Sequence, residues 1–276
     1  MESDATRMGR GFAPFCVGSI SLRPLHIGAI VFFLITCGMV SACDSPTEEK
    51  PKTLGPYDIL LPEPYPELQL NVHNLTQFPV ENQGISRKLD RLSQMIEKPI
   101  TVVHISAGDK AAQEWNITTL EDYLRGAEAP EPAPGIMPIE VLFVEGVYEK
   151  DEEEAVLGLS WGGNRVAVFL NTLRSACESS DLFSTQAEQA TACKFAASQV
   201  LTHEFGHLIG LVNNGIPMVH DHLDPAFEHH DRDPECLMYW ANSRTRIFER
   251  LAARGSEENA WFCDSCQEDI RSAIEP

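Results

Sequence analysis

The sequence predicts an α+β domain with a mixed, twisted sheet and a loop-rich C-terminal part. Runs of β-branched residues alternate with amphipathic helical segments, and one helical segment is much longer than the others. No internal repeat is present. At 276 residues the chain is long enough for one domain of ordinary size with a substantial core.

The expected elements follow one another along the chain. Ile85, Leu89 and Leu92 recur at helical spacing, so residues 85–98 read as an amphipathic helix. Alternating apolar side chains predict a strand at 67–73, and β-rich runs predict strands at 99–106, 139–145 and 165–171. We expect further helices at 118–126 and 187–211. Prolines in 127–135 and the charges of 149–154 indicate loops.

The N-terminus has the features of an export signal. Residues 24–43 carry no charged side chain, and the apolar run 27–40 is short for a membrane span, which needs about 20 residues. The run ends in Val40-Ser41-Ala42-Cys43, which resembles the lipobox of bacterial lipoproteins. That resemblance implies lipidation of Cys43 and an extracytoplasmic, membrane-anchored protein in the periplasm or at the cell surface. An uncleaved anchor helix is the alternative.

This organisation predicts three parts. Residues 1–43 are the expected signal peptide, and residues 44–66, which hold six prolines, are expected to form a semi-rigid extended tether. Residues 67–276 are the expected catalytic domain.

Charge narrows the class of partner. The chain has 41 acidic and 21 basic residues, a net charge of −20, which argues against a nucleic-acid binder. We therefore expect a peptide or protein partner, and contact with the membrane through the N-terminal lipid. The sequence does not determine an oligomeric state.

The histidines are clustered, with six of nine lying between positions 203 and 230. The long helix ends in His203-Glu204-Phe205-Gly206-His207. Residues four apart share a helix face, so the two imidazoles can bind one zinc ion while Glu204 approaches a zinc-bound water as general base. These residues predict zinc-dependent hydrolysis.

The flanking residues carry a family resemblance. HEFGHLIG (203–210) resembles the opening of the metzincin zinc-protease pattern, but Asn213 stands where that pattern has its third histidine. The segment from His230 through Cys236 to Met238 is similar to archaemetzincins and to predicted bacterial lipoprotein metalloproteases. The resemblance implies a metzincin-like fold, His230 as third zinc ligand and Met238 as the Met-turn residue beneath the zinc.

Other third ligands stay open. His222 is the principal alternative to His230, because its imidazole could also reach the zinc. Asn213, His220 and His229 are further candidates.

Five cysteines follow the export signal. Archaemetzincins bind a second, structural zinc with four cysteines. Cys236, Cys263 and Cys266 match three of those positions, and Asp231 occupies the fourth. A disulfide from Cys236 to one of the pair is the alternative. An exported chain permits disulfides, so we expect one between Cys177 and Cys193.

Together these features predict a lipid-anchored zinc endopeptidase. The family resemblance implies that residues 165–171 form the strand that binds substrate by edge addition. Two other functions remain open. One is a zinc-binding surface lipoprotein without catalysis, and the other is a zinc hydrolase of non-peptide amides.

Overall fold

The computed structural model describes residues 53–76, 82–105, 113–149, 155–254 and 260–275. The expected signal peptide, the lipidation site Cys43 and residues 44–52 of the expected tether lie outside these ranges. Among the described residues, no helix is both long and apolar enough to cross a bilayer.

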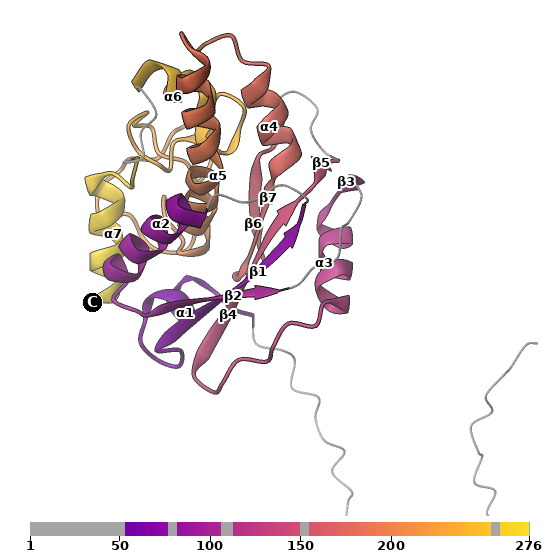
Figure 1. The fold of residues 1–276 in the computed structure, drawn as a ribbon. Coiled ribbons are helices and arrows are strands. Elements are labelled where there is room, and N and C mark those ends of the chain that lie inside the picture. Colours follow the sequence, from indigo (N-terminus) through magenta and orange to yellow (C-terminus); the bar gives the residue numbers. More distant parts are fainter. Residues whose placement is uncertain (1–52, 77–81, 106–112, 150–154, 255–259, 276) are drawn as a thin grey trace, which may run out of the picture. The chain divides into compact units, whose positions relative to one another are not determined.

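A five-stranded mixed sheet forms the centre of the domain, with strand order β2-β1-β4-β7-β6 (Figure 1). The first four strands are mutually parallel and β6 is antiparallel to β7. The strands are β1 Glu67–Leu75, β2 Ile100–Ile105, β4 Ile136–Val144, β6 Gly158–Trp161 and β7 Arg165–Phe169. A two-stranded parallel sheet pairs β3 Gln113–Trp115 with β5 Gly146–Tyr148.

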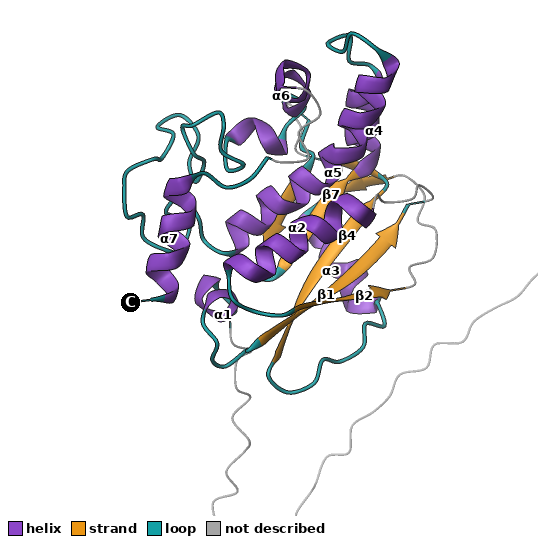
Figure 2. Ribbon diagram, turned by 60° about the vertical axis from the view of Figure 1, so that its left-hand side comes forward, coloured by secondary structure: helices purple, strands orange, loops and turns teal. Residues whose placement is uncertain are grey.

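Helices cover both faces of the sheet, as Figure 2 shows. The helices of the described residues are α1 Pro56–Leu60, α2 Asn82–Met95, α3 Ile117–Gly126, α4 Leu170–Glu178, α5 Gln186–Leu208, α6 Ile247–Arg254 and α7 Asp264–Ile274, with a short 3₁₀ helix, η1, at Trp240–Ser243. The mixed sheet and the long helix α5 agree with the sequence prediction.

The alternation of strand side chains separates two cores. On one face, Val141, Phe143 and Val168 pack with Val200 and Phe205 of α5 in the main core. On the other face, neighbouring strand residues pack with Trp115 and with Leu120 of α3. This smaller core consists of Leu75, Trp115, Leu120, Leu142, Val144, Ala167 and Phe169. Because successive strand residues point to opposite faces, β1, β4 and β7 each contribute to both cores.

The ends of α5 are set by local sequence. Thr185 caps the first turn by accepting a hydrogen bond from the Glu188 backbone amide, and the Glu188 carboxylate accepts one from the Thr185 amide in return. The helix ends at Leu208, three residues earlier than expected, because Gly210 adopts a φ of +81°. This stop holds the second half of the zinc motif on the last turn.

Several elements differ from the sequence prediction. Within the segment expected to be an extended tether, residues 56–60 form α1, and Ile59 and Leu60 are fully buried in the main core. The packed domain therefore begins before Glu67, because α1 supplies apolar side chains that the proline-rich pattern obscures. The C-terminal part also contains α7, which the sequence left within a loop-rich region.

The strand expected to bind substrate is also different. Residues 165–169 form β7, which is paired on one side with β4 and on the other with β6. Both of its edges are therefore used. The antiparallel strand β6 lies at that end of the five-stranded sheet, and the prediction for residues 165–171 was wrong.

Candidate metal centres

Three histidines meet at the end of α5. His203 and His207 project from the same face of the helix, and the loop that follows brings His230 against them. The His230 ring centroid lies 5.2 Å from that of His203 and 4.9 Å from that of His207. The three candidate ligand nitrogens all lie within 4.8 Å of one another.

Backbone carbonyls orient two of the rings. His203 Nδ1 lies 2.7 Å from the Leu237 carbonyl oxygen, and His230 Nδ1 lies 2.8 Å from that of Glu228. With Nδ1–H donating to these carbonyls, each Nε2 carries a free lone pair. His230 Nε2 is buried and has no hydrogen-bond partner among the described residues, and His203 Nε2 lies 3.2 Å from His207 Nε2. Convergent imidazole nitrogens, two of them on rings held from behind by a backbone carbonyl, fit a zinc ion.

Burial keeps these imidazoles neutral. Burial, together with the charges of the neighbouring histidines, lowers the pKa of His203 well below its ordinary value and that of His207 to about 3. Burial also lowers the pKa of His230. Zinc binds the unprotonated imidazole, so the site is in its metal-binding form at neutral pH.

Glu204 follows His203 on α5 and is almost completely buried. Burial raises the pKa of its carboxyl to about 8, and a hydrogen bond with Ser160 of β6 opposes that shift. Gly158 of β6 packs on it closely, since a Cβ there would come within 3.1 Å of Glu204 Oε1. The edge strand therefore runs directly past the candidate catalytic carboxylate.

Met238 lies beneath the helix that carries the motif. A Cβ on Gly206 would overlap the Met238 sulfur. The glycine in the middle of the motif therefore allows the sulfur of Met238 to approach the α5 backbone, next to the histidines. This is the position that the sequence resemblance implied for a Met-turn residue.

A second cluster gathers cysteines with an aspartate and a histidine. His222, Asp231, Cys263 and Cys266 place one ligand atom each within 4.8 Å of the others. Cys236 adjoins them, with its Sγ 3.6 Å from Cys266 Sγ. Its sulfur also accepts hydrogen bonds from the backbone amides of Met238, at 3.4 Å, and Cys263, at 3.3 Å. Amide hydrogen bonds of this kind stabilise a thiolate.

Within this cluster His222 bridges two buried carboxylates. Its Nδ1 lies 2.6 Å from Asp231 Oδ2, and its Nε2 lies 2.8 Å from Asp269 Oδ2. Burial opposes a charge on this ring, but the two carboxylates outweigh it and raise the pKa of His222 to about 11. Asp269 is itself fixed by the Val219 amide, which donates to its Oδ1.

The structure thus sorts the candidates for third ligand. His230 lies with His203 and His207, whereas His222 lies in the cysteine cluster. Asn213 is exposed, with a φ of +58°. The exposed His220 faces Glu268, at 3.5 Å.

Sequence reasoning missed the two carboxylate contacts of His222 and the part played by Asp269. Nothing local in the sequence marks Asp269, which is 47 residues away from its partner. Asp231, the other carboxylate partner of His222, was predicted only as the fourth ligand of the second zinc.

Cys177 of α4 and Cys193 of α5 form a disulfide, with their Cα atoms 5.7 Å apart. The pair joins the first half of the motif helix to α4. The three remaining described cysteines are not in disulfides.

Neither a protein-family model nor a curated protein sequence matches the chain. Among solved structures, the archaemetzincin from Methanopyrus kandleri is 16% identical, with a TM-score of 0.46 over 76% of this chain and 97% of that one. A zinc-dependent peptidase from Methanocorpusculum labreanum is 16% identical, with a TM-score of 0.44 over 73% and 99%. The archaemetzincin from Archaeoglobus fulgidus is 14% identical, with a TM-score of 0.38 over 73% and 99%. Because these TM-scores are all below 0.5, the similarities carry no argument about the function of this chain.

Proposed function

We propose that this chain is a zinc-dependent endopeptidase, with its catalytic zinc held by His203, His207 and His230. The observation that carries the proposal is the meeting of three neutral imidazoles at the end of α5, in the same helical segment as the buried carboxyl of Glu204. Three protein ligands leave a fourth position open, which is the arrangement of catalytic zinc sites. A site used only for binding has no need of a buried carboxyl at that position.

A zinc ion in this site supplies Lewis acidity, which polarises a peptide carbonyl and lowers the pKa of a bound water. Glu204 accepts the proton of the attacking water and then donates it to the leaving amine. Its pKa of about 8 applies without a metal, and a neighbouring cation lowers it, so Glu204 is ionised when it must act as a base. Ser160 positions this carboxyl through its hydrogen bond.

The substrate would lie along β6. This strand ends the five-stranded sheet, and its residue Gly158 packs against Glu204. An extended peptide that adds to this edge by backbone hydrogen bonds would pass over the histidines. This mode of binding depends little on the side chains of the substrate, which is what an endopeptidase requires.

The cysteine cluster is proposed as a second, structural zinc site. Cys236, Cys263 and Cys266 supply sulfur ligands, and Asp231 or His222 supplies the fourth. If His222 binds through Nδ1, its contact with Asp269 becomes the carboxylate–histidine pair that commonly orients a zinc ligand. The ligand residues are largely buried, which suits a closed structural site.

The location of the protein is proposed to be extracytoplasmic, with a lipid on Cys43. The apolar run before Val40-Ser41-Ala42-Cys43 supports it, and so does the Cys177–Cys193 disulfide, because such bonds persist in oxidising compartments. Metabolic labelling with a fatty acid, compared between wild type and Cys43→Ala, tests this. Equal labelling of the two proteins would reject lipidation at Cys43.

The enzymatic proposal is tested with Glu204→Gln. We expect the variant to keep its zinc and its fold but to cleave a quenched peptide library at least about 100-fold more slowly, the usual contribution of a general base. Glu249→Gln, an exposed glutamate in α6, is the matched control and should retain full activity.

Two results would redirect the proposal. If wild type binds zinc but cleaves nothing, the protein is a zinc-binding lipoprotein. If it hydrolyses amide probes other than peptides in a Glu204-dependent way, it is an amidase.

A further inference from the structure

The sheet face beneath α3 is divided into an apolar part and a polar part. The smaller core fills one part, with residues such as Leu142 and Phe169. Asn71 and His73 of β1, Glu140 of β4 and Arg165 of β7 occupy the other. Asn71 and His73 are 1% and 0% exposed. Buried polar groups at the centre of a sheet are costly unless they are hydrogen-bonded, and an apolar core would serve stability better.

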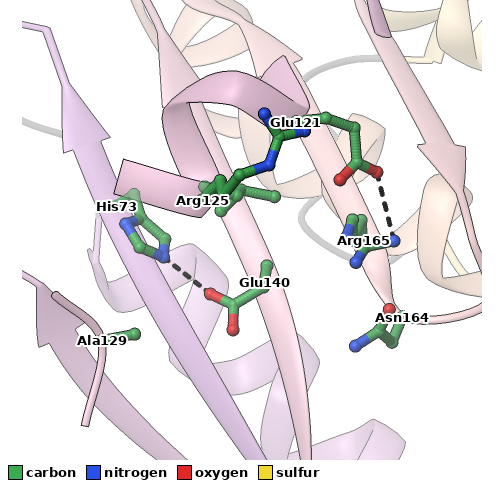
Figure 3. Close-up of a pocket in the computed structure, with 8 residues that line it drawn as sticks. His73, Glu121, Arg125, Ala129, Glu140, Asn164 and Arg165 are labelled. Atoms are coloured by element: carbon green, nitrogen blue, oxygen red, sulfur yellow. Dashed lines mark hydrogen bonds and ion pairs between the residues drawn. The ribbon is translucent and has the colours of Figure 1, made fainter. Parts of the chain in front are cut away.

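A cavity of about 340 Å³ opens over this polar part (Figure 3). Its lining includes His73, Glu140, Asn164 and Arg165 from the sheet side. Glu121, Leu124 and Arg125 of α3 and Ala129 of the following loop line it from above. The volume is at the small end of the range for ligand pockets, so it suits a compact ligand. The cavity lies on the opposite face of the sheet from α5 and the histidine cluster.

The carboxylate of Glu140 is held firmly at the base of this cavity. His73 Nε2 lies 2.7 Å from Glu140 Oε2, and Asn71 donates to Oε1 at 2.9 Å. His73 is oriented in turn by Tyr123, whose hydroxyl lies 3.1 Å from Nδ1. Each Glu140 oxygen thus has one protein partner, and an ionised carboxylate has acceptor capacity for more.

Arg165 is anchored separately. Its Nη1 lies 3.2 Å from Glu121 Oε1, which also accepts a hydrogen bond from the indole of Trp161 at 2.7 Å. The guanidinium has five N–H donors, so donors remain after this contact.

Glu140 and Arg165 are direct partners in the register of β4 and β7. Opposite charges in such positions share one face of the sheet and normally pair. Here they do not: Glu140 bonds to His73 and Asn71, Arg165 bonds to Glu121, and the two charged groups both face the cavity (Figure 3). An acceptor and a cation are thus presented side by side, each held by other residues.

We propose that this cavity binds a free α-amino acid in its zwitterionic form, with the ammonium group on Glu140 and the carboxylate on Arg165. The two charges of an α-amino acid flank one carbon, and Glu140 and Arg165 are register partners on neighbouring strands whose backbones lie about 4.8 Å apart. Leu124 and Ala129 offer apolar contact to a small side chain. The proposal does not depend on the zinc site.

Arg125 provides a matched control. It also lines the cavity, but its side chain is 74% exposed and is paired with Asp122 at 2.7 Å. If the fixed guanidinium of Arg165 binds the carboxylate, loss of Arg125 should matter little.

The test is calorimetric titration of the zinc-loaded full-length chain with glycine, L-alanine and L-leucine. We expect saturable binding of at least one, and at least tenfold weaker binding of its N-acetyl and amide derivatives, which each lack one charge. Glu140→Gln and Arg165→Gln should each weaken binding at least tenfold, and Arg125→Gln less than twofold.

The Arg165→Gln variant also distinguishes this cavity from the catalytic zinc. An amino acid bound at the zinc would bind equally well to wild type and to Arg165→Gln. Arg165 is 31% exposed, so that variant decides the question even if Glu140→Gln fails to fold. No saturable binding to wild type, or binding unchanged in Arg165→Gln, would overturn the proposal.

Discussion

The histidine cluster and the cysteine cluster lie close together in the sequence but differ in chemistry. In the first, neutral nitrogens meet beside a buried acid, and two of the three rings are only partly buried. In the second, sulfur and carboxylate atoms surround a histidine that already bridges two aspartates, and most of the residues are buried. The difference suggests a division of work: the first cluster has an open position for chemistry, and the second joins α7 to the loop that carries His230.

The largest effect should come from the histidine cluster. His203→Ala removes a ligand and should abolish peptide cleavage, while the zinc content falls by only one ion, because the cysteine cluster is untouched. Activity assays with metal analysis by native mass spectrometry measure both. His220→Ala, an exposed histidine outside the cluster, should behave like wild type. A His203→Ala protein with undiminished activity would break the comparison.

The cysteine cluster should instead govern stability. Cys266→Ser should remove the second zinc and lower Tm by more than about 10 °C, because structural zinc contributes directly to folding. Ser265→Ala, its neighbour on α7, is the control. At a temperature where Cys266→Ser is folded, this variant should still cleave peptide. If Tm is unchanged while activity vanishes, the roles of the two clusters are reversed.

The Cys177–Cys193 disulfide sharpens the comparison, because it stabilises α5 without touching either cluster. Its residues are 16 apart, so a Cys177→Ala/Cys193→Ala double variant should lose about 3 kcal/mol, or roughly 6–12 °C in Tm. Zinc content should remain at the wild-type value below the transition. Thermal unfolding followed by circular dichroism gives the first quantity, and metal analysis gives the second. Loss of zinc from the folded double variant would contradict this independence.

The last effect concerns the pH dependence of stability in the metal-free protein. The folded pKa of His207 is about 3, against an ordinary 6.5. Between these values the unfolded chain binds a proton that the folded chain does not, so the contribution of His207 is complete above pH 6.5 and is lost as pH falls towards 3. Denaturant unfolding across this range should show a shallower loss of stability in His207→Gln. Parallel curves for the two proteins would show that burial does not shift this histidine.

Much of the fold could be predicted from sequence because its signals are local. The alternation in β1, the β-rich run of β4 and the periodicity of α2 located these elements to within a few residues. The order of the strands was not accessible. β6 has four residues, too few for a pattern, and the resemblance that implied β7 as the substrate-binding strand did not reveal it. α1 was hidden by the prolines around it.

The site residues also divide into those that local spacing brings together and those that only the tertiary structure brings together. His203, Glu204 and His207 lie within five residues on one helix, so spacing alone brings them together. His230 depended on a family resemblance, because the path of the loop between α5 and His230 is not encoded by any period. The contacts of His222 with Asp231 and Asp269 span 9 and 47 residues and required the tertiary structure.

The most direct measurement is an anomalous difference map at the zinc edge from crystals of the zinc-loaded protein. The account predicts one peak about 2.0–2.1 Å from Nε2 of His203, His207 and His230, and a second among Cys236, Cys263 and Cys266. A single peak confined to the cysteines, or a catalytic peak bound by His222 with His230 remote, would contradict it.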